Sequence, residues 1–184
     1  MTKSFFVLFT LFYVFLSMPS QVFGEDSSKT IATNPMTNER LDILIRRLDD
    51  QPQGRNGFWT FKISNLSISV ITDEEANRMR IIIPIIEMEN IDNDQLHRVM
   101  QANFDSALDA RYAIAKNILW SAYIHPLTSL SDEEFLNGLG QTVNLVTNYG
   151  GSYSSGLLTF GGGDSQALKD RQLINELLEK GNAI

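Results

Sequence analysis

The sequence predicts an α+β domain, a twisted antiparallel sheet flanked by helices, with a further helix at the C-terminus. Short apolar or alternating segments bounded by turn residues indicate strands. Longer segments with apolar residues three and four positions apart indicate helices. These segments follow the order αβββαββα and then the last helix. Runs of strands between single helices are typical of an antiparallel sheet rather than of a parallel α/β sheet.

The N-terminal segment, residues 1–24, has the features of a secretory signal peptide. Lys3 precedes an apolar run from Phe5 to Leu16, and Gly24 supplies a small residue for cleavage. An uncleaved membrane anchor is the alternative, but the run is shorter than the ~20 residues of a spanning helix. We therefore expect a periplasmic or secreted mature chain that begins with a disordered leader over residues 25–36.

The composition excludes several classes of function. The chain of 184 residues carries a net charge of −7 at pH 7, and removal of residues 1–24 takes away Lys3 but no acidic side chain. Negative charge repels phosphate backbones and anionic lipid, so we expect no nucleic-acid binding and no membrane binding after cleavage. The sequence contains no cysteine, which excludes disulfides, thiol redox catalysis and thiolate metal sites.

The first helix is expected from Thr37, a good N-cap, to about Asp50. Its apolar stripe has the spacing of one buried helix face and consists of Leu41, Leu44, Ile45 and Leu48. The segment Gln51–Gly57 contains a proline and two glycines, so it should end the helix.

Two strands are expected next, Phe58–Ile63 and Leu66–Ile71, joined by a tight turn at Ser64–Asn65. In the first of them we expect Phe61 on one face and Trp59 near the other.

A third strand, Arg78–Ile86, should follow an acidic turn at residues 72–77, which is interpreted as a solvated loop. Pro84 cannot donate a hydrogen bond to a neighbouring strand. We therefore expect this strand either to lie at a sheet edge or to bulge at Pro84.

The second helix should begin at Asp92 or Asp94. Its apolar residues are expected on a single stripe comprising Leu96, Val99, Met100, Phe104 and Leu108.

A hairpin should follow, with strands Arg111–Ala115 and Ile118–Ile124 and a two-residue turn at Lys116–Asn117. This turn fixes the register, so that Ala113 faces Trp120 and Ile114 faces Leu119. Both faces of the hairpin are apolar, and we expect a layer over each, at least in part.

The third helix is expected to start at Ser131, which forms a capping box with Glu134, and to end before Gly150. The tail from Gly150 to Phe160 lacks the lysine of a phosphate-binding loop, so we interpret it as an extension packed on the domain. The glycines at 161–163 link it to a last helix over residues 164–180, whose narrow stripe includes Leu168, Ile174 and Leu177. This helix either folds back on its own domain or binds a second copy.

Chemistry-bearing residues are few. A triad of His125 with Ser129 or Ser131 can be drawn, but no G-x-S-x-G motif supplies the nucleophile. Asp92, Asp94 and His97 could ligate a metal, but the aspartates have the ordinary role of capping a helix. We expect no enzyme activity, no cofactor and no metal. The alternative hypothesis is a periplasmic enzyme with an unrecognised active site.

Several motifs together resemble the type III secretion chaperone-like domain, including its YbjN-like branch. They lie within residues 37–160 and read NRMRI (77–81), ANFDSALDARYAI (102–114), LWSAY (119–123), HPL (125–127), LSDEEF (130–135) and YSSG (153–156). The resemblance implies a small acidic protein, commonly a homodimer, that binds an extended or helical segment of a partner protein without doing chemistry. Secretion chaperones work in the cytoplasm, so the signal peptide indicates an exported relative.

We therefore expect a protein or peptide segment to bind at a sheet edge or in a helix groove. The candidate contact residues are Trp59, Phe61 and Met79 on the strands and Leu168, Ile174 and Leu177 on the last helix. The three strand residues have the alternative of lying in the core.

Overall fold

The computed structural model describes residues 34–55, 57–155 and 164–182, with side chains from residue 171 onward in the last of these ranges. They belong to one unit, Thr33–Ile184. The signal peptide and most of the leader expected from the sequence lie outside the described residues. Within those residues, no helix has both the length and the apolar character needed to cross a bilayer.

The strands of the described residues all join one antiparallel sheet, in the order β1-β2-β3-β4-β6-β5. The strands are β1 Gln53–Gly54, β2 Phe58–Ile63, β3 Leu66–Asp73, β4 Arg78–Glu87, β5 Arg111–Ala115 and β6 Ile118–His125. The sheet confirms the α+β fold class. β1 was not expected, because two residues carry no periodic signal.

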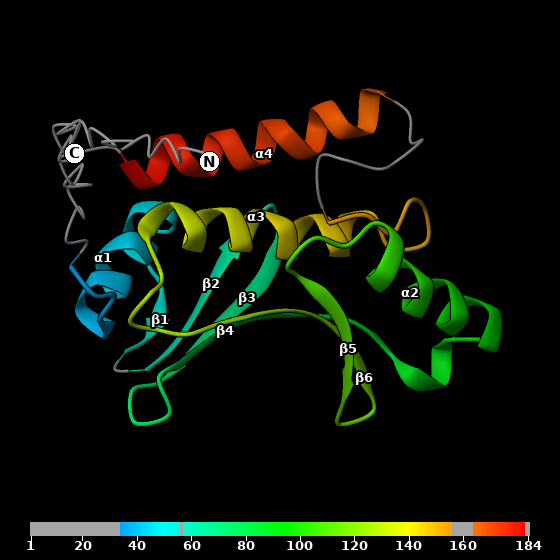
Figure 1. Ribbon diagram of the computed structural model, residues 1–184, viewed down its shortest axis with the longest axis horizontal. Helices are drawn as coiled ribbons and strands as arrows, with labels where there is room; N and C mark the ends of the chain where they lie inside the picture. Colours follow the sequence, from blue (N-terminus) through cyan, green and yellow to red (C-terminus); the bar gives the residue numbers. More distant parts are fainter. Residues whose placement is uncertain (1–33, 56, 156–163, 183–184) are drawn as a thin grey trace, which may run out of the picture. The chain divides into compact units, whose positions relative to one another are not determined.

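Four α-helices and one 3₁₀ turn complete the described part of the chain. They are α1 Asn38–Leu48, η1 Met88–Asn90, α2 Asn93–Asp105, α3 Asp132–Thr147 and α4 Asp164–Asn182. Side chains cap the first three α-helices at the predicted residues, Thr37, Asp92 and Ser131. Figure 1 shows α3 crossing one face of the sheet, with α4 on the outer side of α3. The order αβββαββα plus a last helix is thus confirmed, apart from β1.

Both predicted two-residue turns have the positive φ angles of type I′ hairpins. The angles are 49° and 66° at Ser64–Asn65 and 52° and 60° at Lys116–Asn117. The β5–β6 register pairs Ala113 with Trp120, as the turn predicted.

Pro84 lies in a central strand, since β4 pairs with β3 on one side and β6 on the other. The edge position allowed for it is therefore wrong, and the bulge is right, because the register with β6 shifts between Pro84 and Ile86. The shift accommodates a residue that lacks a backbone N–H.

One face of the sheet forms the core with α1 and α3. Trp59 and Phe61 share this face and are 0% and 2% exposed, which corrects the expectation that they lie on opposite faces. Residues two apart in a strand point the same way. Other core side chains from the sheet and α3 are Ile68, Val70, Met79, Ile81, Ile83, Leu119, Phe135, Leu139 and Val143.

The opposite side of the sheet, which we call the open face, carries the alternate residues of each strand. On this face Phe58 is 49% and Ile124 58% exposed, while Trp120 and Ala122 are half-buried. Within the hairpin, the layer expected over this side is therefore missing at Ile124 and partial at Trp120 and Ala122. The described helices pack on the opposite, core side.

The stripe expected on α2 is split in two. Val99 is buried, whereas Met100, Phe104 and Leu108 are 57%, 91% and 39% exposed. Met100 and Phe104 are four positions apart, so they form their own row on α2, rotated by about 100° from the row of Val99, whereas Leu108 follows the end of the helix at Asp105. The row points to solvent instead of the core.

Candidate protein-binding site

The structure places the predicted contact residues in the interior. Trp59, Phe61 and Met79 belong to the core, which is the alternative that the sequence left open. Ile174 and Leu177 of α4 are 6% and 3% exposed. The side chain of Leu168 lies outside the described residues. The five described residues thus form no accessible surface in this chain.

The buried side of α4 packs on the same chain, on α3 and α1. A Cβ atom on Gly140 of α3 would lie 2.6 Å from Ile174 Cγ1, so only glycine allows this close contact. Arg47 of α1 donates a hydrogen bond to the carbonyl of Gly181 near the end of α4. Of the two arrangements considered for the last helix, the single chain adopts the fold-back.

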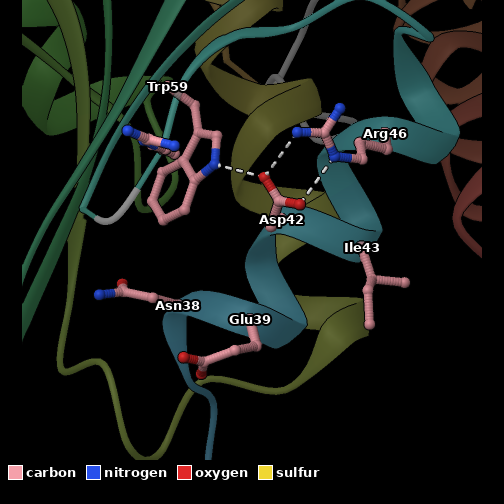
Figure 2. Close-up of a pocket in the computed structure, with 7 residues that line it drawn as sticks. Asn38, Glu39, Asp42, Ile43, Arg46 and Trp59 are labelled. Carbon is pink, nitrogen blue, oxygen red and sulfur yellow. Dashed lines mark hydrogen bonds and ion pairs between the residues drawn. The ribbon is translucent and has the colours of Figure 1, made fainter.

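A concave feature beside the core runs along α1, and we call it the α1 groove. Its volume is about 410 Å³, which falls within the range of ligand-binding clefts. It is lined by Asn38, Glu39, Asp42, Ile43, Arg46, Arg55 and Trp59. Figure 2 shows the residues that α1 and β2 contribute.

Trp59, Asp42 and Arg46 form a hydrogen-bonded wall of the groove (Figure 2). The indole Nε1 of Trp59 donates to Asp42 Oδ1 at 2.9 Å, and Arg46 Nε donates to Asp42 Oδ2 at 2.7 Å. The bond from Arg46 is the main cause that lowers the pKa of Asp42, and the bond from Trp59 contributes less. The carboxylate is therefore ionised at neutral pH, and its position is fixed from two sides.

The position of α1 against the sheet is held by further polar contacts. Thr72 of β3 donates a hydrogen bond to Asn38 Oδ1 at 2.6 Å, and Lys62 N of β2 donates to Asp49 Oδ2 at 2.9 Å. Arg40 forms a 2.7 Å ion pair with Asp132 of α3. Because both ends of α1 are attached, the groove is formed before any partner binds.

Ile43 supplies an apolar surface at the rim of the groove and is 54% exposed. It was missed because the sequence argument considered only the residues of the inward stripe. The signal was present, since an isoleucine between Asp42 and Leu44 lies off that stripe and has no core to pack against. Glu39 and Arg55, both exposed, add one charge of each sign to the lining.

Neither end of the sheet offers a long free edge. β1 has only two residues. On β5, Asn103 of α2 occupies the outer backbone groups of Tyr112, accepting from its N–H at 2.8 Å and donating to its carbonyl at 3.0 Å. Alternate residues of an antiparallel strand point these groups outward, so a side chain takes the place of a partner strand at Tyr112.

The residues considered for catalysis do not converge. His125 Nδ1 lies 2.8 Å from the carbonyl oxygen of Pro126, and its ring stacks on Tyr123 with centroids 6.0 Å apart. Ser131 bonds with Glu134 in the capping box of α3. His97 is exposed, and Asp92 caps α2. Over the described residues, no group of three or more His, Asp or Glu side chains is arranged to hold a metal ion.

Fold and site together define the class of the molecule: an α+β domain with a preformed groove beside α1 and shielded sheet edges. Two solved chaperone structures are similar to it. The HopA1–SchA chaperone–effector complex matches with 14% identity and a TM-score of 0.45, over 62% of this chain and 98% of that one. The Yersinia pestis type III secretion chaperone SycH, solved with a stable fragment of YscM2, matches with 13% identity and a TM-score of 0.45, over 60% and 98%.

No family model matches the chain, and no curated protein matches it.

Proposed function

We propose that the protein is an exported, non-enzymatic binding module that receives a polypeptide segment in the α1 groove. The observation that carries this proposal is the exposed Ile43 beside a cavity whose wall is fixed by the Trp59–Asp42–Arg46 contacts. A preformed groove with an apolar contact and a few oriented polar groups is the usual form of a recognition site. The chaperone-like resemblance of the motifs supports the same function.

The groove is preferred to the sheet edges as the binding site. Strand addition needs several free backbone groups in a row. β1 is too short to provide them, and Asn103 occupies those of Tyr112. A segment that binds by side-chain contacts in the groove needs no free edge.

The lining indicates the chemistry of the segment. An apolar side chain would pack on Ile43, and its burial would contribute roughly 1–2 kcal/mol. Glu39 and Arg55 would pair with opposite charges on either side of it. Asp42 is already paired with Arg46 and would keep the wall rigid rather than recruit the ligand.

In vivo photo-crosslinking tests this proposal. A photo-reactive residue at position 43 should capture a polypeptide in the exported fraction, whereas one at the exposed Glu133 of α3 should not. The captured segment is then identified, synthesised and titrated against the protein by calorimetry. Equal capture at both positions would contradict the proposal.

We also propose that two copies associate through the exposed row of Met100 and Phe104 on α2, together with Leu108, which follows the end of this helix. Phe104 is 91% exposed in the single chain. Its full burial at an interface would stabilise the dimer by roughly 1.5–3 kcal/mol. One row on each copy can pack against itself about a two-fold axis. The homodimer expected from the sequence would then leave both α1 grooves open.

A further inference from the structure

The charge of the open face differs from that of the whole chain. The net charge of the chain is −7, yet basic side chains outnumber acidic ones on this face. Strand alternation and register place there the basic residues Lys62, Arg78, Arg80 and Arg111 and the acidic residues Asp73 and Glu87. An acidic protein therefore presents one locally basic surface.

Apolar side chains on this face are interleaved with the arginines. Cross-strand pairs form a continuous row from Phe58 to Ile71, from Ile71 to Arg80 and from Arg80 to Ile124. The ends of this row, Phe58 and Ile124, are 49% and 58% exposed. Next to it lies a hollow of about 450 Å³ that includes Ile71, Arg78 and Arg80 in its lining.

Arg78 and Arg80 form no ion pair with any acidic side chain of the described residues. Asp73 is the register partner of Arg78, yet the two side chains are not in ion-pair contact. A guanidinium group presents a planar set of donors that matches a carboxylate. Both arginines can therefore donate hydrogen bonds to carboxylates of another molecule.

We propose that the open face is a second binding surface, distinct from the α1 groove, for an extended polypeptide segment that combines acidic and apolar side chains. Such a segment would place carboxylates on Arg78 and Arg80 and apolar groups on Ile71 and Ile124. A polypeptide is favoured over an anionic membrane because the remainder of the chain is strongly acidic and would be repelled by the bilayer.

The width of the open face determines the length of the peptide used as a probe. Four steps between neighbouring strands, from β2 to β5, span about 19 Å, which an extended peptide covers with about six residues. A fluorescent peptide of about eight residues that alternates leucine and glutamate is titrated into the full-length chain by anisotropy. A peptide that alternates leucine and lysine serves as the charge control.

The glutamate peptide should bind, and the lysine peptide should not. Arg80→Glu should weaken binding by at least about tenfold, and added salt should weaken binding to the unchanged protein. Arg98→Glu, which changes an exposed arginine on α2, is the matched control and should bind as the unchanged protein does.

Four results would overturn the inference. The glutamate peptide could fail to bind the unchanged protein, or it could bind the Arg80→Glu variant equally well. Vesicles containing phosphatidylserine could bind in an Arg80-dependent way, which would assign the face to a membrane. Light scattering could show that Arg80→Glu abolishes self-association, which would assign it to a second copy. None of these results bears on Ile43, so the groove proposal stands or fails separately.

Discussion

The indole N–H of Trp59 and the carboxylate of Asp42 are joined by a 2.9 Å hydrogen bond that connects β2 to α1. Trp59 is fully buried, while Asp42 is partly exposed at the groove. One contact thus links the core to the candidate binding site. The stability of the groove wall can therefore be examined by changing the tryptophan alone.

Replacement Trp59→Phe should lower the free energy of unfolding by about 1–3 kcal/mol, because it removes the donor to Asp42 and leaves a small void. Urea denaturation measures the change. Trp120→Phe is the control, since Trp120 Nε1 also donates a 2.9 Å bond, to Ala115 O, but in a solvent-exposed setting. A larger loss for Trp120→Phe would contradict the structural role given to Trp59.

Acid should destabilise the fold through carboxylates whose pKa is lowered in the folded state. Backbone hydrogen bonds from Gln51 and Lys62 lower the pKa of Asp49, and the bond from Arg46 lowers that of Asp42. A lowered folded pKa gives stability that is present above the unfolded pKa and is lost as pH falls through the folded pKa.

The free energy of unfolding should therefore change little from these two residues between pH 7 and about pH 5, and should fall below about pH 4. Asp49→Asn should make that acid-induced fall shallower. Chemical denaturation at a series of pH values measures it. An unchanged slope in the variant would remove Asp49 from this account.

Asn103→Ala should both destabilise the domain and expose the outer edge of β5. The variant loses the two bonds between Asn103 and the backbone of Tyr112, a cost of about 1–3 kcal/mol. An exposed edge also promotes aggregation, which static light scattering detects. Gln101→Ala, at an exposed position on the same helix, should change neither quantity.

Phe104→Ser should convert the proposed dimer to a monomer without loss of folding, because Phe104 is 91% exposed in the single chain. Light scattering gives the mass, and thermal unfolding of the monomer tests its integrity. His97→Ser, on an exposed part of the same helix, should keep the dimer. A monomeric mass for the unchanged protein would already contradict the proposed interface.

Local chemistry explains which parts of the fold could be predicted from sequence. The I′ turn at Lys116–Asn117 and the capping box at Ser131 depend on neighbouring residues only, and both were correct. The outward row containing Phe104 was not separated from the inward row of Val99, since apolar character alone does not say which neighbour covers a helix face.

The candidate site depended on contacts between distant segments. The groove forms where α1 meets the β2 strand, and no local pattern reports the bond between Trp59 and Asp42, which are 17 positions apart. Ile43 was the one available signal, because it lies outside the apolar stripe of its helix. The contact residues predicted from the sequence were large apolar side chains such as Phe61, and this side chain is buried in the core.

Binding of the captured segment to the Ile43→Glu variant tests whether the α1 groove is the binding site. Calorimetry with the segment identified by crosslinking at position 43 should give an affinity at least about tenfold weaker for Ile43→Glu, with an unchanged melting temperature because Ile43 is 54% exposed. Equal affinity for the variant and the unchanged protein would contradict the assignment of the α1 groove as the binding site.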